Sequence, residues 1–443
     1  MRRILVVVVA ALLLFAEQAH AQSIALLRDA EIEKDLKTFE MPVWKAAGLA
    51  PDALHIYLIN DMRLNSFVAG GQNIFIYVGT ILRAKTPNQL VGIMAHETGH
   101  IAGAHLARSL VGMRRAMYEG LAAMVASIGL AVLSGGIGAA TIAGAASVPE
   151  RAWRKYSVEQ EARADQAAMY FLDKTHQSTR GLLQFFEILQ QEEFLTGQQE
   201  IPYLMTHPLT SERIQYVRYH VAHSPYSNNR DPPAWTRMLK RMKAKLRGFL
   251  QDPDKTLSEY PLTDHSLPAR YARAIAWYRE PDLTKSVPAV DGLIRDYPKD
   301  PYFRELKGQM LFENGHVAAA VAPYEEAVKL DPNANLLRIE LAQVQIETGN
   351  AALVTAARDN LERVTQFEVD NPEAWRLLAI AYGREHKIGL ATLALAQESI
   401  ATGDNKTARL QAMHAEKILP AGLLRQRALD IAAEAKRDQN NDH

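Results

Sequence analysis

Two histidines and a glutamate form a short pattern whose residue types and spacing suit metal binding. In His96-Glu97-Thr98-Gly99-His100 the imidazoles are four residues apart, and residues at that spacing share one face of an α-helix. Both imidazoles could therefore bind one Zn²⁺ ion, at about 2.0–2.1 Å each. Glu97 lies off that face, where its carboxylate could take a proton from the water that attacks a carbonyl. The pattern predicts zinc-assisted hydrolysis of peptides.

A third ligand has to come from another part of the chain. Glu161 and Asp165 lie four residues apart on an acidic stretch that is expected to be helical over 151–196. One carboxylate could bind the metal while the other holds a ligating histidine through its free ring N–H. Glu159 is an alternative to Glu161 that spacing disfavours only modestly, because a charged helix face is usually just solvated.

His105 suggests a different ligand set, which the spacing rejects. The elongated metzincin motif needs Gly at position +3 and His at position +6 from the second histidine. Gly103 fits, but Leu106 occupies position +6 and His105 is one residue too early. We therefore expect His105 to be a packed or hydrogen-bonded helix residue.

The elements around the motif can be predicted from periodicity and capping signals. Thr86-Pro87-Asn88-Gln89 combines an N-cap threonine, a proline at the first position and a glutamine at the third, so a helix should begin at Pro87. Residues 24–47 read as an amphipathic helix. Residues 54–77 alternate with period two, which predicts a small sheet whose last strand, 74–77, could lie at an edge.

Composition limits the class of protein. The length of 443 residues suggests about three domain-sized units. The chain is 48% hydrophobic and 23% charged, and these values are typical of globular proteins. Fifty Lys and Arg balance fifty Asp and Glu, so no overall field attracts nucleic acid, and we expect no nucleic-acid partner. Cysteine is absent, which excludes disulfides, thiol nucleophiles and thiolate metal sites and leaves histidines and carboxylates as ligands.

The first 21 residues are typical of a cleavable signal peptide. A basic start at Arg2 and Arg3 precedes an apolar run over 4–15, and Ala19-His20-Ala21 supplies the cleavage pattern. The apolar run is too short for a stable membrane span, although an uncleaved anchor is the alternative. Export combined with the absence of cysteine points to a periplasm, where disulfides are permitted but not required.

Residues 120–149 carry no charge, which raises the alternative of an integral membrane protease. His100 precedes the stretch and Glu161 follows it, so a single crossing would separate two ligands of one metal. Two crossings would leave at most about 14 residues each, or roughly 21 Å, short of a hydrocarbon core of about 30 Å. We expect a hydrophobic hairpin that covers the cleft or touches a membrane face.

The C-terminal half predicts a linker helix followed by helical repeats. Within the predicted linker over 231–267, residues 232–250 place apolar side chains on one face and six Lys or Arg on the other, which suggests a solvated linker helix or one that lies on anionic lipid. Pro298 and Pro332 are 34 residues apart. This is the period of a tetratricopeptide repeat, and about four degenerate copies fit within 268–436. Such hairpins stack into a superhelix that binds partners.

The motifs resemble the HEXXH…EXXXD pattern of the gluzincins in the HtpX and CaaX prenyl protease family. The resemblance rests on residues 96–100 and 161–165. It implies an α+β fold, in which a mainly helical protease domain with a small sheet over 22–230 precedes an all-α repeat domain. It implies one Zn²⁺ per chain. The implied roles are zinc ligation by His96, His100 and Glu161, general base catalysis by Glu97, support or proton handling by Asp165, and gating or transition-state roles near the metal for His207 and Arg213.

A leader, this protease domain and repeats together are similar to the group of beta-barrel assembly-enhancing proteases of the Gram-negative periplasm. That similarity implies unfolded or misassembled outer-membrane proteins as substrates, the barrel-assembly machinery as a partner of the repeats, and a peripheral membrane contact. The alternative is a repeat-based chaperone or scaffold with a structural or latent protease domain. A missing glutamate or ligand would favour that alternative, yet Glu97 and all three candidate ligands are present.

Overall fold

The computed structural model describes residues 26–50, 53–69, 72–103, 158–196 and 201–441. The predicted signal peptide, His105 and the uncharged stretch 120–149 lie outside these residues. No helix in the described part of the chain is long and apolar enough to cross a membrane. The chain divides into two compact units: unit 1 contains residues 37–231 and those up to 28, and unit 2 contains residues 29–36 and 232–443. The predicted α+β class is confirmed.

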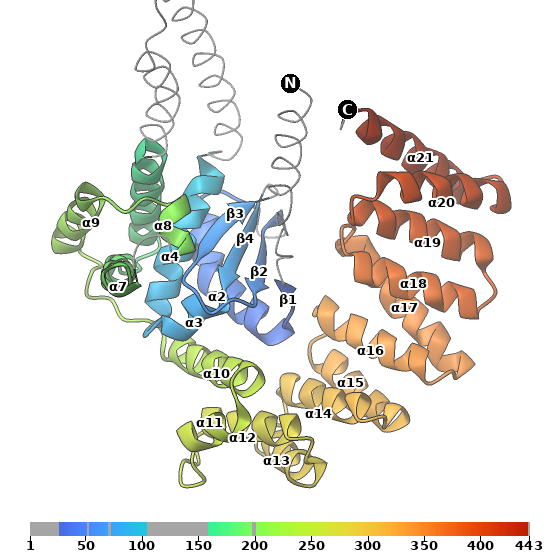
Figure 1. Ribbon diagram of the computed structural model, residues 1–443, viewed down its shortest axis with the longest axis horizontal. Helices are drawn as coiled ribbons and strands as arrows, with labels where there is room; N and C mark the ends of the chain where they lie inside the picture. Colours follow the sequence, from blue (N-terminus) through green and yellow to red (C-terminus); the bar gives the residue numbers. More distant parts are fainter. Residues whose placement is uncertain (1–25, 51–52, 70–71, 104–157, 197–200, 442–443) are drawn as a thin grey trace, which may run out of the picture. The chain divides into compact units, whose positions relative to one another are not determined.

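Unit 1 combines a small mixed sheet with helices (Figure 1). The sheet has the strand order β1-β2-β4-β3, in which β2 and β4 are parallel and the two other pairs are antiparallel. Its elements are β1 (Leu26–Leu27), α2 (Ala30–Ala46, shared with unit 2), β2 (His55–Ile59), β3 (Ser66–Ala69), β4 (Asn73–Tyr77), α3 (Val78–Arg83), α4 (Pro87–Ala102), a helix over 158–174, α7 (Arg180–Thr196), α8 (Pro202–Thr206) and α9 (Ser211–His223).

The sheet confirms the period-two prediction but not the expected edge. Ile56 and Leu58 of β2 and Ile74 and Ile76 of β4 are buried, so alternate residues of both strands form one core face. Strand β4, however, lies between β2 and β3, and the outer strands of the described sheet are β1 and β3. The expectation of an edge at 74–77 was wrong, because alternation indicates which face of a strand is buried and not which strands lie beside it.

Helix α2 begins later than its amphipathic pattern suggested. Leu26 and Leu27 pair with β2 instead of continuing the helix. Asp29 then caps α2, because its Oδ1 accepts a hydrogen bond from Ile32 N at 2.8 Å. Glu33 Oε1 accepts in turn from Asp29 N at 3.2 Å. These reciprocal bonds satisfy backbone donors of the first turn, so the helix begins at Ala30.

Unit 2 is entirely helical in the described residues (Figure 1). Beyond residues 29–36 of α2, its helices are α10 (Pro233–Leu250), α11 (Pro253–Glu259), α12 (Leu267–Arg279), α13 (Leu283–Asp296), α14 (Tyr302–Glu313), α15 (Val317–Leu330), α16 (Asn335–Glu347), α17 (Ala351–Phe367), α18 (Pro372–Arg384), α19 (Ile388–Ala401), α20 (Asn405–Ile418) and α21 (Leu423–Asn441). Small residues let its helices α14 and α15 pack closely: Ala320 and Ala327 are fully buried, and a Cβ at Gly308 would lie 2.5 Å from the ring of Tyr324.

Helix α10 is not a uniformly solvated linker, because one of its basic side chains is buried and a second is mostly covered, both in ion pairs. Lys245 Nζ lies 2.8 Å from Asp29 Oδ2 and 3.3 Å from Glu31 Oε2. Arg241 pairs with Glu31 and donates from Nη2 to Asp300 Oδ1 at 2.9 Å. The expected fully solvated basic face was therefore wrong at these two positions. Their acidic partners, far away in the sequence, compensate for the burial of the positive charges.

The same cluster should make unit 2 less stable as the pH rises. Burial raises the pKa of Glu305 to about 8, and the Lys245 ammonium only partly opposes that rise. Between its unfolded value near 4.5 and about 8, the folded state holds more protons than the unfolded state, so the free energy of unfolding falls as pH increases. Glu305→Gln should reduce that loss by on the order of 1 kcal/mol per pH unit.

Thermal unfolding of the full chain between pH 5.5 and 8 would measure this slope. Glu326→Gln is the matched control, since Glu326 is 62% exposed on α15 and should leave the slope unchanged. Equal slopes for the wild type and Glu305→Gln would contradict the prediction. Asp35, whose pKa burial raises to about 7, should keep part of the slope in the variant.

Candidate metal centre

Helix α4 presents the motif from the buried centre of unit 1. His96 and Glu97 are fully buried, and the His100 side chain is 12% exposed. The predicted start at Pro87 is confirmed, although the Thr86 side chain makes no cap hydrogen bond. Gln89 caps the start of the helix instead, since its Oε1 accepts a hydrogen bond of 2.7 Å from the backbone N–H of Lys85. The helix therefore holds the imidazoles one turn apart on one face.

A glycine inside the motif lets a second helix approach α4. A Cβ at Gly99 would lie 2.7 Å from the carbonyl oxygen of Ala164, a contact too short for any other residue. Ala164 belongs to the helix over 158–174, which also carries Glu161 and Asp165. The absence of a side chain at Gly99 therefore brings both predicted carboxylates to the motif.

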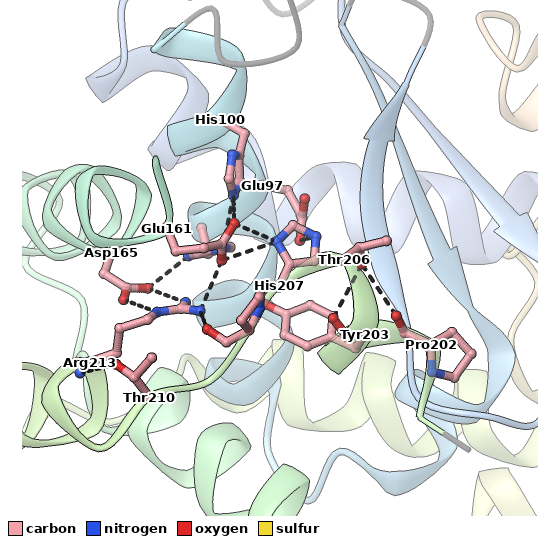
Figure 2. Close-up of polar contacts among 12 residues, drawn as sticks. Glu97, His100, Glu161, Asp165, Pro202, Tyr203, Thr206, His207, Thr210 and Arg213 are labelled. Atoms are coloured by element: carbon pink, nitrogen blue, oxygen red, sulfur yellow. Dashed lines mark hydrogen bonds and ion pairs between the residues drawn. The ribbon is translucent and has the colours of Figure 1, made fainter. Parts of the chain in front are cut away.

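The two imidazoles and the Glu161 carboxylate meet at one point. His96 Nε2 lies 3.1 Å from His100 Nε2 and 3.3 Å from Glu161 Oε2. Glu161 Oε1 lies 3.3 Å from His100 Nε2. Figure 2 shows His100 and Glu161 turned toward each other from two helices. Glu159, the alternative acid, is exposed.

Asp165 and Arg213 hold these side chains from behind. Asp165 Oδ1 lies 2.9 Å from His96 Nδ1, so a proton on Nδ1 leaves Nε2 available for a metal. Arg213 donates from Nε and Nη2 to the two Asp165 oxygens at 2.7 and 2.9 Å. Its Nη1 lies 2.9 Å from Glu161 Oε2 and also donates to Pro208 O at 2.8 Å. Arg213 thus orders both carboxylates and the loop after His207 (Figure 2).

His207, at the C-terminal end of α8, completes the cluster. Its Nδ1 lies 3.1 Å from Glu161 Oε1, and its Nε2 lies 3.8 Å from Glu97 Oε1. The ring stacks on Tyr203, with centroids 4.6 Å apart and an angle of 26° between the planes. The structure therefore brings together all seven candidate residues of the sequence analysis, and it adds Tyr203. No sequence signal marked Tyr203, because one tyrosine next to apolar residues is normally a core residue.

Burial and neighbouring charges set the protonation states of the cluster. Burial lowers the pKa of His100 to about 3, so this imidazole is neutral at pH 7. Burial opposes ionisation of Glu161, but the His207 charge and hydrogen bonds to the histidines outweigh it and hold the Glu161 pKa well below its usual range. Neutral imidazole and ionised carboxylate are the forms that bind metal ions.

The pKa values of His96 and Glu97 are both raised. Burial lowers the pKa of His96, but its hydrogen bonds to Asp165 and Glu161 outweigh that effect and raise it to about 9. A metal that binds His96 at neutral pH would therefore release a proton. Burial raises the pKa of Glu97 above its usual range, toward the value that suits a general base near neutral pH.

The cluster fits a divalent metal ion of the zinc type. Ligand atoms of His96, His100, Glu161 and His207 all lie within 4.8 Å of one another. Tetrahedral zinc with bonds of about 2.0–2.1 Å separates its ligand atoms by about 3.3 Å, which matches the distances between the imidazoles and Glu161. Both Glu97 oxygens and His207 Nε2 are buried without a hydrogen-bond partner among the described residues. These atoms can accept hydrogen bonds from a reacting group that lies between them.

Residues 27–221, which contain every residue of this cluster, match peptidase family M48. The chain is a metalloprotease, and its segment over residues 27–221 is similar to this family. It is 23% identical to the beta-barrel assembly-enhancing protease of Yersinia pestis over 74% of this chain and 67% of that protein. It is 22% identical to the protein of the same name from Escherichia coli, over 81% of this chain and 73% of that protein.

A third relative matches a shorter segment. Metalloprotease YcaL of Escherichia coli is 29% identical over 168 residues, which are 38% of this chain and 61% of that protein. The M48 match ends ten residues before the boundary between the two units at residues 231 and 232. The metal-binding motif therefore belongs to the M48 segment and unit 1, and unit 2 lies beyond that segment apart from the first residues of α2.

Proposed function

We propose that this metalloprotease is a zinc endopeptidase with one Zn²⁺ per chain. His96, His100 and Glu161 would hold the ion, and His207 or water would take the fourth position. The observation that carries this proposal is the arrangement of those three side chains, with ligand atoms 3.1–3.3 Å apart, beside a buried Glu97 whose oxygens lack hydrogen-bond partners among the described residues.

The surrounding side chains suit the hydrolysis of a peptide bond. A bound zinc ion polarises the scissile carbonyl and lowers the pKa of water. Glu97 would accept the proton of the attacking water and pass it to the leaving amine, which keeps the transfer within one buried group. Asp165 would keep His96 in the tautomer that ligates through Nε2. The contacts of Arg213 with Asp165, Glu161 and Pro208 favour a positioning role over direct contact with a transition state.

The proposed substrates are misfolded or stalled outer-membrane proteins in the periplasm. Support comes from the two relatives named beta-barrel assembly-enhancing protease, which this chain matches over 74% and 81% of its length. The leader-like residues 1–21 support export. The helical repeats of unit 2 would bind the barrel-assembly machinery and assist assembly, and a peripheral membrane contact would place the enzyme near its substrates.

The test is cleavage of an unfolded outer-membrane barrel protein by the purified chain without residues 1–21. We expect fragments that disappear after chelation and return with added Zn²⁺, and slower cleavage of an unfolded soluble protein of equal length. Absence of cleavage by metal-loaded enzyme would leave the alternative, a repeat-based chaperone or scaffold with a latent protease domain. Equal cleavage of both proteins would retain the peptidase and remove the proposed preference.

His207 is predicted to hold the enzyme in a latent state. A fourth protein ligand would displace the attacking water, and His207 is near enough to Glu161 and Glu97 to act in this way. His207→Ala should raise the basal rate on an unfolded substrate by on the order of tenfold, if about one molecule in ten is open in the wild type. His223→Ala, an exposed histidine on α9, is the matched control. An unchanged or lower rate would contradict gating.

A further inference from the structure

One buried acid in unit 1 has no part in the mechanism above. Glu40 on α2 is fully buried, and its Oε1 accepts a hydrogen bond of 2.9 Å from Thr98 Oγ1. Thr98 is also fully buried and is the central residue of the metal-binding motif. The other Glu40 oxygen, Oε2, has no hydrogen-bond partner among the described residues. A buried side-chain hydrogen bond thus ties the motif to α2.

The bond lies on the back of the ligand helix. Thr98 follows His96 by two residues and precedes His100 by two, so at about 100° per residue it is about 200° around the helix from each imidazole. A contact at that position can restrain the rotation of α4 about its own axis. Rotation of α4 would turn both imidazoles away from Glu161 together.

Besides the contact of His96 with Asp165, other directional side-chain bonds of α4 to its neighbours lie about two turns before the motif. There Asn88 Nδ2 donates to Ser178 O at 2.7 Å and Gln89 Nε2 donates to Gln184 Oε1 at 2.9 Å. A Cβ at Gly92 would lie 2.5 Å from Leu182 N, and one at Gly99 would lie 2.7 Å from Ala164 O. At these positions α4 meets its neighbours through backbone, without a side chain that interlocks. Apolar packing has no preferred direction, whereas a hydrogen bond requires a distance and an angle.

An acid is an expensive residue for a purely structural position. Burial raises the pKa of Glu40 well above its usual range, and the hydrogen bond from Thr98 opposes that rise only in part. A pair of apolar side chains would fill the same space without desolvating two polar groups. The bond therefore adds something that packing alone would not, which is a directional restraint on the angle of α4 at the motif itself.

We propose that Glu40 is a positioning residue for the metal centre: its hydrogen bond to Thr98 sets the rotation of α4 that points His96 and His100 at Glu161. This inference rests on the proposed ligand set. Loss of the bond should weaken metal binding and distort the coordination geometry without removing any ligand.

The test compares two substitutions of similar length in the mature chain. Glu40→Gln keeps the oxygen that accepts from Thr98, and Glu40→Met removes it. Glu40→Met should lower zinc affinity, measured by competition with a chelator, by about 10–100-fold, as loss of an outer partner of a metal ligand does. It should also change the visible absorption spectrum of the Co²⁺-loaded protein. Glu40→Gln should restore both the affinity and the spectrum.

A matched control separates positioning from general stability. Thr80 Oγ1 makes a similarly buried hydrogen bond to Asn65 O, at 2.8 Å, on α3. Thr80→Val should lower the unfolding temperature but leave the zinc affinity and the Co²⁺ spectrum unchanged.

Thr98→Val and Thr98→Ser test the same hydrogen bond from its donor side. They replace the Glu40 variants as the test if Glu40→Met does not fold. Valine should reproduce the loss of affinity and serine should reverse it. Wild-type affinity and spectrum in Glu40→Met, or in Thr98→Val if the former is insoluble, would overturn the proposal. Failure of the proposed metal centre is a separate result, since the wild type itself would then bind neither Zn²⁺ nor Co²⁺.

Discussion

Replacement of Glu97 by glutamine should lower kcat/KM for an unfolded protein substrate by on the order of 10³-fold, because general base catalysis contributes about 10²–10⁴-fold. A glutamine amide has nearly the same shape as the carboxylate but accepts no proton at neutral pH. Glu97 is not among the residues whose ligand atoms cluster within 4.8 Å of one another. The zinc content should therefore remain one ion per chain.

The measurement is steady-state cleavage of a fluorogenic unfolded substrate, together with metal analysis of the same preparations. Glu187→Gln provides the control, because Glu187 is an exposed acid on α7 of the same unit, with a side chain that is 51% exposed. Activity within tenfold of the wild type at full zinc occupancy would assign the proton transfer to another group. Loss of zinc along with activity would instead make Glu97 a ligand or a structural support.

The parts of the site that depend on helical spacing could be predicted from the sequence. His96 and His100 share a face because α4 is a regular helix. Glu161 and Asp165 are also four residues apart on a helix, so with Glu161 at the ligand cluster Asp165 lies where it can contact His96. His207 could not be found in this way. It reaches the cluster because α8 ends there, and spacing within one element carries no information about contacts between residues 46 positions apart.

The incorrect expectations share the same physical cause. The basic face of α10 seemed solvated because its partners, Glu31 and Asp300, are distant in the sequence. The position of β4 depends on parallel pairing with β2, and local alternation does not report such pairing. Tyr203 was missed although it lies only four residues before His207, because nothing in the local sequence indicates that α8 lies beside the cluster. Local periodicity predicts where helices and strands form and which of their faces are buried. Which elements lie beside one another depends on contacts between residues far apart in the sequence.

Replacement of Glu161 by alanine should remove the metal ion together with all peptidase activity. Glu161 supplies the only carboxylate among the cluster residues within the described chain, and its oxygens lie 3.3 Å from both imidazoles of the motif. A catalytic zinc site needs three protein ligands. Loss of one should weaken binding by more than the roughly 10–100-fold that loss of an outer partner costs. Asp165→Asn should fall within that smaller range, because Asp165 contacts His96 and is not among the clustered ligand residues.

The two carboxylates can be compared with an exposed acid on the same helix. Glu159→Ala, two residues before Glu161, should retain full zinc and activity because Glu159 faces solvent. Equilibrium dialysis against a zinc buffer should then order the three variants as Glu161→Ala weakest, Asp165→Asn intermediate and Glu159→Ala equal to the wild type. Glu161→Ala would also leave Arg213 without one of its two carboxylate partners, so its unfolding temperature must be measured in the presence of a chelator. If metal-free Glu161→Ala unfolds near the metal-free wild type yet still binds zinc with wild-type affinity, Glu161 is not a ligand and the third donor has to be sought at His207.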